Sequence, residues 1–186
     1  MRLATIRLDG EELAGIVAES GILPIRALNT AKGSAWEETM LPLIRTGQLR
    51  ELTAWYNAGG KTELNGVSGV VPYEKVVYAP LYRDPKRIFG IGLNYVDHAG
   101  DIGDAAPQGF PGSFFKMADT LIGEGDEIHL PALKEAQKTT AEAELGVILG
   151  KDCRDVTEEN WLDVVAGYTT ILDMTEESIL KGNEFL

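Results

Sequence analysis

The chain has 186 residues, of which 44% are hydrophobic, so it is long and apolar enough to bury the core of one or two domains. Its formal net charge is −12, and its Lys and Arg residues form no basic stripe, which argues against a nucleic-acid partner. It has one cysteine, no apolar run of membrane-spanning length and no signal peptide pattern. We therefore expect a cytoplasmic protein without a disulfide or a membrane partner.

The first 80 residues are predicted to form a small α/β N-terminal domain. Strand-like segments at residues 3–8 and 12–17 flank the turn Asp9-Gly10, which is typical of a hairpin. Apolar residues then recur at helical spacing over residues 36–56, which predicts one or two helices. A domain boundary is expected near residue 80.

Residues 81–186 are rich in glycine and in strand-like segments. Their one predicted helix covers residues 158–165, with Asp155 or Thr157 as its N-cap and Gly167 as its stop. The predicted strands cover residues 87–92, 113–116, 127–130, 141–149 and 168–172. The whole chain is thus expected to be α+β and mostly β.

Three carboxylates stand out in these strands. Glu142 and Glu144 are two residues apart, so a strand places both on one face, and Asp173 ends an apolar run in the next strand. A bound cation would remove the repulsion between them, and three oxygen ligands favour magnesium, manganese or calcium over zinc. The alternative is that the glutamates form the solvent face of an edge strand and Asp173 caps a helix from Glu176 onward. Residue spacing alone is compatible with both the metal site and this alternative.

A series of motifs over roughly residues 86–180 resembles the fumarylacetoacetate hydrolase family, in its bacterial two-domain form. The order and spacing of the motifs carry the resemblance: Gly92-Leu-Asn-Tyr-Val-Asp-His98, Phe114-Phe-Lys116, Leu121-Ile-Gly-Glu-Gly-Asp126, Glu142-Ala-Glu144-Leu-Gly, Val165-Ala-Gly-Tyr168 and Asp173-Met-Thr. The resemblance implies a rolled β-sheet catalytic domain over residues 81–186, in which Glu142, Glu144 and Asp173 hold magnesium or manganese, with calcium possible.

The resemblance also implies catalytic and substrate-binding residues. The family's catalytic histidine falls on His98, and its usual glutamate partner is replaced by Asp101, which can still orient an imidazole. Asn94, Tyr95 and Lys116 are candidate substrate contacts, although a solvent-facing role for Lys116 fits equally well. Residues 100–112 resemble the family's lid, and a homodimer is expected by resemblance alone.

The chain departs from the family's pattern at two places. Residues 175–178 read Thr-Glu-Glu-Ser where many members carry an arginine, so the substrate class is open. The chain also ends at Leu186, before the family's Lys-Ser-Phe-Asp segment. We therefore expect an incomplete catalytic domain, with the remainder in a separate or unrecorded segment, and expect metal binding and turnover to need that segment.

The leading hypothesis is a metal-dependent hydrolase of a carbon–carbon bond in a small 1,3-dicarbonyl or 2-keto acid, such as an acylpyruvate or fumarylpyruvate. An isomerase, a tautomerase or an oxaloacetate-type decarboxylase would use the same metal site. A noncatalytic ligand-binding or regulatory domain is the alternative from another class, favoured by the two departures. A small dicarboxylic or 2-keto acid is the expected ligand in each case.

Overall fold

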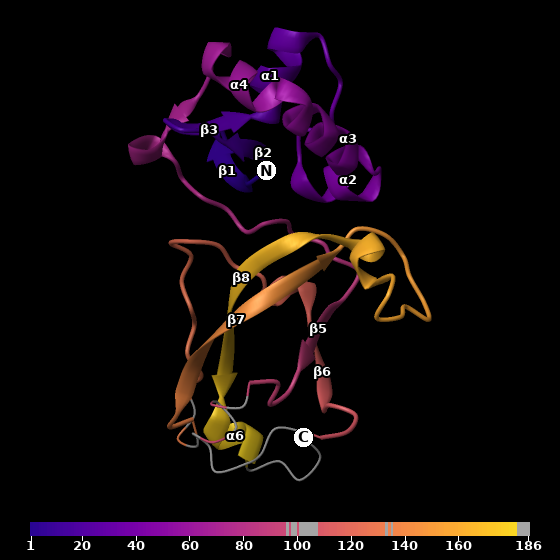
Figure 1. The fold of residues 1–186 in the computed structure, drawn as a ribbon. Helices are drawn as coiled ribbons and strands as arrows, with labels where there is room; N and C mark the ends of the chain where they lie inside the picture. Colours follow the sequence, from indigo (N-terminus) through magenta and orange to yellow (C-terminus); the bar gives the residue numbers. More distant parts are fainter. Residues whose placement is uncertain (96, 98–99, 101–107, 133, 135, 182–186) are drawn as a thin grey trace.

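The computed structural model describes residues 1–186 except 96, 98–99, 101–107, 133, 135 and 182–186. It has an α+β fold in which strands predominate, as predicted. The described strands form a four-stranded sheet in the order β1-β2-β3-β4 and two separate pairs, β5-β6 and β7-β8. Figure 1 shows the four-stranded sheet with its helices at one end of the molecule and the two strand pairs at the other.

The chain begins with the predicted hairpin. Strands β1 (Leu3–Leu8) and β2 (Glu11–Val17) pair antiparallel, with Leu8 opposite Glu11. The two turn residues both have positive φ, 51° at Asp9 and 84° at Gly10, as in a two-residue turn whose twist matches that of the strands.

Two further strands and several helices complete this part of the chain. The strands are β3 (Gly21–Pro24) and β4 (Val71–Pro72), and the helices are α1 (Ile25–Lys32), α2 (Met40–Arg45), α3 (Gln48–Trp55) and the short α4 (Lys61–Glu63). Helices α2 and α3 confirm the helical periodicity of residues 36–56. None of the helices in the described part of the chain has the length and apolar character needed to cross a membrane.

The buried core belongs to this first part. Among the described residues, every buried hydrophobic residue lies between Ile6 and Val67. Leu28, Leu43 and Leu52 bring α1, α2 and α3 onto the sheet, and each of these side chains is fully buried. Packing of apolar helix faces on one side of the sheet therefore holds this part together.

The chain then crosses to the second part while staying attached to β1. The Thr5 hydroxyl donates to the Leu81 carbonyl at 2.6 Å, and the Ala79 N–H donates to the Thr5 carbonyl at 3.0 Å. Ile148 and Ala166, from the second part, pack against the first part's core. The two parts are thus in contact, while the exact domain boundary near residue 80 stays a prediction.

The second part contains two antiparallel strand pairs. β5 (Ile88–Ile91) pairs with β6 (Ser113–Lys116), and β7 (Thr139–Leu149) pairs with β8 (Val165–Glu176), which leads into α6 (Glu177–Lys181). The β7-β8 register is continuous until a bulge at Ile148/Leu149. Four predicted strands of the second part are confirmed, and β8 is longer than expected.

The strand predicted at residues 127–130 is wrong. The segment has the alternating pattern Glu-Ile-His-Leu, but it pairs with no strand among the described residues, and Ile128 and Leu130 are exposed. Alternation alone does not form a strand, because most of a strand's stability comes from a paired neighbour and a covered face.

The helix predicted at residues 158–165 is also wrong. A 3₁₀ turn covers Trp161–Val164, and Val165 already belongs to β8. The apolar side chains of this turn are largely exposed, with Trp161 at 44% and Leu162 at 63%. A short helix needs an apolar surface to pack on, and the described part of the chain leaves Trp161 and Leu162 exposed.

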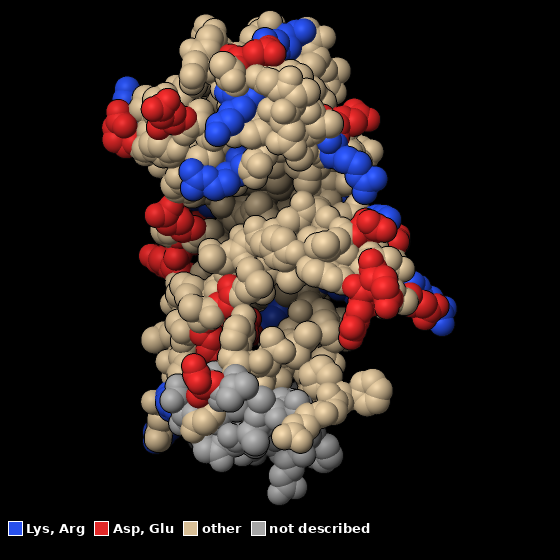
Figure 2. Space-filling view, in the orientation of Figure 1, with Lys and Arg blue, Asp and Glu red and all other residues tan. Residues whose placement is uncertain are grey.

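One side of β7 and β8 forms an exposed apolar face. Leu145 is 60% exposed and Leu172 62%, and the face as a whole comprises Ala143, Leu145, Val147, Leu149, Tyr168 and Leu172. Figure 2 shows a broad uncharged area over these strands, with charged side chains gathered at its borders. The opposite face of the same two strands is more covered and carries the carboxylates.

Candidate metal centre

The register of β7 and β8 places the predicted metal ligands together on one face. Glu142 lies directly opposite Asp173, and Glu144 lies opposite Ile171, two residues farther along. Directly opposed residues of an antiparallel pair point to the same face, with Cβ atoms about 5 Å apart. All three carboxylates therefore project from the face opposite the apolar one.

This carboxylate face is not the solvent face of an edge strand. Glu142 and Glu144 are half-buried, whereas their neighbours Ala143 and Leu145 are exposed. The Asp173 side chain is only 12% exposed and lies within β8, four residues before α6 begins, so it does not cap that helix. The geometry thus disfavours both parts of the alternative reading.

Asp173 is paired with a lysine. The Lys116 ammonium, at the end of β6, forms an ion pair with the Asp173 carboxylate and donates to the Met174 carbonyl at 3.0 Å. It also lies 5.9 Å from the centre of the Phe114 ring, within cation–π distance. That ring lies across Gly90 of β5, where a Cβ would be 2.3 Å from its edge. Absence of a side chain at Gly90 therefore lets the Phe114 ring lie beside the lysine.

The residues fit a hard divalent cation in donor chemistry and in backbone placement. Carboxylate oxygens are what such a cation prefers, and Asp173 already binds a positive charge. The side chains themselves do not converge: within the described ranges, no three His, Cys, Asp or Glu side chains gather closely enough to hold a metal ion. The assignment of Glu142, Glu144 and Asp173 as ligands stays a prediction.

Tyr95 contacts β7 beside the carboxylates. Its hydroxyl accepts a hydrogen bond from the Leu145 N–H at 3.2 Å. The turn that carries Tyr95 contains Leu93 with φ of 55°, a left-handed conformation that costs a non-glycine residue about 1 kcal/mol. Asn94 is exposed. Tyr95 and Lys116 thus both reach the β7-β8 ladder, while their roles in substrate binding, like that of Asn94, stay predictions.

The predicted catalytic pair lies outside the described residues. The structure does not describe His98, Asp101 or most of the predicted lid at residues 100–112. Their roles therefore remain predictions from the resemblance.

The end of the ladder beyond the carboxylates carries a further charged group. The Thr139 hydroxyl donates to the Glu176 carboxylate at 2.5 Å, and the Lys138 N–H donates to it at 3.0 Å. These hydrogen bonds, that of Thr139 foremost, lower the pKa of Glu176 to about 2. Glu176 therefore stays ionised at neutral pH.

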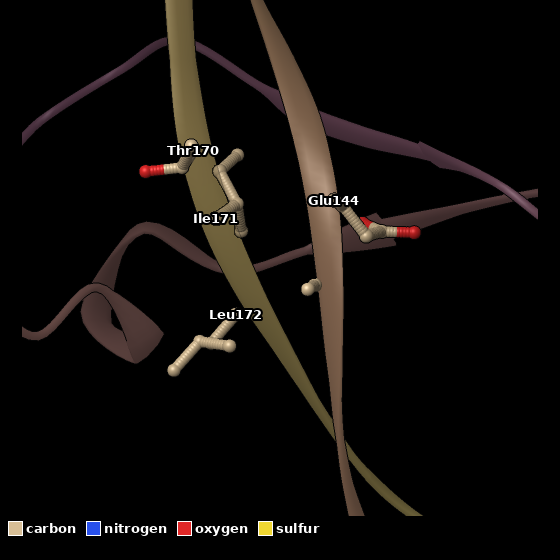
Figure 3. Close-up of a pocket in the computed structure, with 5 residues that line it drawn as sticks. Glu144, Thr170, Ile171 and Leu172 are labelled. Carbon is tan, nitrogen blue, oxygen red and sulfur yellow. The ribbon is translucent and has the colours of Figure 1, made fainter.

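A pocket at the middle of the ladder is lined by Ala143, Glu144, Thr170, Ile171 and Leu172. In Figure 3 the Glu144 carboxylate points away from Thr170 and Leu172, which lie on the far side of β8. Most of the lining is apolar or uncharged, and neither Glu142 nor Asp173 contributes to it. Glu144 is therefore its one link to the carboxylate set.

Sequence reasoning missed the partner of Lys116. The lysine ends a short strand 57 positions before Asp173, so neither spacing nor periodicity connects the two. The Phe-Phe-Lys motif marked the residue, but only the packing of β6 against β8 identifies the aspartate. Lys116 is consequently part of the carboxylate site and not a solvent-facing lysine.

Comparison with known proteins supports a common family. Residues 87–184 match the protein-family model that is described as fumarylacetoacetate (FAA) hydrolase C-terminal. A protein of Burkholderia cenocepacia, named as an inferred hydrolase, is 43% identical over 101 residues, which cover 53% of this chain and 35% of that protein. The chain thus matches about a third of the length of such curated relatives.

Solved structures resemble the chain over nearly all of its length. Maleylpyruvate hydrolase from Sphingobium sp. SYK-6, in complex with manganese (II) ion and pyruvate, is 32% identical with a TM-score of 0.69, and the match covers 94% of this chain and 59% of that one. Fumarylacetoacetate hydrolase from Exiguobacterium antarcticum, 24% identical with a TM-score of 0.68, shares the fold over 97% of this chain and 58% of its own. Because the family model covers more than half of its residues, the chain belongs to the fumarylacetoacetate hydrolase family.

Proposed function

We propose that this protein is a divalent-metal-dependent hydrolase that cleaves a carbon–carbon bond in a small 1,3-dicarbonyl or 2-keto acid of the acylpyruvate or fumarylpyruvate type. The observation that carries the proposal is the β7-β8 register, which sets Glu142 opposite Asp173 with Glu144 on the same face. A lysine beside these carboxylates adds a positive charge that suits an acidic substrate.

Glu142, Glu144 and Asp173 would hold the ion. Their oxygen donors suit magnesium, manganese or calcium, and the maleylpyruvate hydrolase relative is in complex with manganese, which favours magnesium or manganese here. When bound, such an ion supplies a Lewis acid that polarises the substrate's carbonyl oxygens and stabilises the negative charge formed as the carbon–carbon bond breaks.

The chain's own residues orient the substrate and move protons. Lys116 lies beside Asp173 and would pair with the substrate carboxylate, with Tyr95 and Asn94 as further contacts. His98, oriented by Asp101, would take a proton from the attacking water. The water's hydroxyl joins the acyl carbon, the carbon–carbon bond breaks, and its electron pair takes a proton to complete the methyl group of pyruvate. The products are pyruvate and a carboxylic acid.

The maleylpyruvate hydrolase relative supports the proposed class of substrate. The maleylpyruvate hydrolase relative holds pyruvate, which is one product expected from cleavage of an acylpyruvate. The proposal therefore places the cut between the acyl carbon and the methylene carbon of the pyruvate unit. We also propose that the protein acts as a homodimer, which sedimentation would test.

The test is an assay of the natural full-length protein with an acylpyruvate and Mn²⁺ or Mg²⁺, in which release of pyruvate is measured. We expect activity to disappear with a chelator and to return with the metal. Asp173→Asn should lower kcat/KM by at least about 100-fold, because a carboxylate ligand is lost.

Asp152→Asn is the matched control, since Asp152 is an 87% exposed aspartate that also pairs with a lysine, Lys86, at 2.8 Å. It should keep full activity. If no acylpyruvate is cleaved in a metal-dependent reaction, the hydrolase proposal is wrong. Metal-dependent decarboxylation or isomerisation of a 2-keto acid would support the proposed metal centre but would assign a different reaction to it.

A further inference from the structure

The Asp173 carboxylate and the Lys116 ammonium form an ion pair on the carboxylate face. The Asp173 side chain is 12% exposed and that of Lys116 30%, so water covers little of either charge. Withdrawing a carboxylate from water is costly unless a cation compensates it. The lysine therefore supplies the positive charge that compensates the aspartate.

A divalent cation would need the same carboxylate oxygens. The lysine occupies one of them, Oδ1, and the electrostatic repulsion between an ammonium and a nearby metal ion disfavours simultaneous binding. We propose that Lys116 is the resident counter-ion of Asp173, and that a divalent cation binds this site by displacing its ammonium. This inference rests on the proposed metal site and adds the step by which that site is loaded.

The displaced ammonium would stay close by. It donates to the Met174 carbonyl at 3.0 Å and lies over the Phe114 ring, and neither contact involves the carboxylate. Loading of the metal would thus convert Lys116 from a partner of Asp173 into a cation available to an incoming acid. The order follows directly: the metal binds first and the acidic substrate second.

Metal affinity is the quantity to measure. Mn²⁺ alone is titrated by calorimetry into the natural full-length protein and into its Lys116→Met variant. Breaking an ion pair of this kind costs enough to weaken Mn²⁺ binding about tenfold, so Lys116→Met should bind Mn²⁺ about tenfold more tightly. Lys116→Arg, which keeps the charge, should stay nearer the wild type.

Lys86→Met is the matched control, because Lys86 also pairs with an aspartate but is 64% exposed and lies outside the carboxylate face. Its affinity for Mn²⁺ should equal that of the wild type. Unchanged or weaker Mn²⁺ binding by Lys116→Met would overturn the counter-ion role and leave the proposed function standing. Failure of both wild type and Lys116→Met to bind Mn²⁺ would overturn both.

A measurement on the wild type covers the case in which Lys116→Met does not fold. The rates at which Lys116 and Lys86 react with an acetylating reagent are followed by mass spectrometry with and without Mn²⁺. Displacement predicts that Mn²⁺ speeds the reaction at Lys116 about tenfold and leaves Lys86 unchanged. Equal rates at Lys116 with and without Mn²⁺ would contradict the displacement.

Discussion

The two parts of the chain use apolar side chains in opposite ways. Among the described residues, all buried hydrophobic side chains lie between Ile6 and Val67, and all large exposed ones lie at Tyr73 or beyond. The first part is stabilised by burial, with helices packed on a sheet. The second depends on the β7-β8 ladder and on contacts that Ile148 and Ala166 make with the first part's core. Equivalent substitutions should therefore have different effects in the two parts.

The largest effect is expected from Leu28→Ala. This side chain is fully buried between α1 and the sheet, so its removal loses buried area and leaves a cavity. We expect the free energy of unfolding to fall by about 2–5 kcal/mol. Urea denaturation followed by circular dichroism measures it. A loss below about 1 kcal/mol would show that the core relaxes to fill the space. It would also weaken the contrast between the buried first part of the chain and the exposed second part.

Ile148→Ala should have an intermediate effect. Ile148 is only half-buried, but it packs against the first part's core from β7. The free energy of unfolding should fall by roughly 1 kcal/mol. Its neighbour Val147 points to the other face and is 48% exposed, so Val147→Ala is the control and should change little. Equal losses from both would mean that contact with the core does not stabilise β7.

Acid should destabilise the ladder through Glu176. Its pKa is lowered to about 2 from an ordinary 4.5, so its hydrogen bonds stabilise the folded state above pH 4.5 and are lost as the pH falls toward 2. Thr139→Val removes the leading hydrogen bond and should move the midpoint of acid unfolding to higher pH. Thr140→Val, one residue along, is the control. No shift with Thr139→Val would remove Glu176 as a source of acid stability.

The smallest effect is expected from Leu145→Ala, on the apolar face of β7 and β8. The side chain is 60% exposed, so in this chain the free energy of unfolding should change by no more than about 0.5 kcal/mol. A loss of about 2 kcal/mol or more, measured by urea denaturation, would show that a further surface covers this face.

Local chemistry made part of the fold predictable. The Asp9-Gly10 turn identified the first hairpin because these residues tolerate the positive φ that a two-residue turn needs. The alternation of residue types along β7 could be recognised in the sequence because the two faces of the strand differ. Glu142 and Glu144 lie on one face and apolar residues lie on the other. Period two was therefore enough to put both glutamates on one face.

The rest depends on contacts between distant segments. The incorrect helix at residues 158–165 had N-cap candidates and a glycine stop, but its apolar side chains Trp161 and Leu162 are exposed. Helix α1 was not predicted, because it follows β3 directly and has no side-chain cap to mark its start.

The pairing of Lys116 with Asp173 joins β6 to β8, and such a contact has no local signal in the sequence. His98 and Asp101 lie outside the described residues, so their assignment still rests on resemblance.

The pairing of Glu142 with Asp173 also has an evolutionary consequence. Side chains alternate along β8, so inserting one residue between Ala166 and Asp173 would turn Asp173 toward the apolar face without altering any ligand. A two-residue insertion would keep the face and shift the aspartate to a different partner. Changes of length in this strand are therefore more damaging than most changes of residue type, and variation should accumulate as substitutions and not as insertions or deletions.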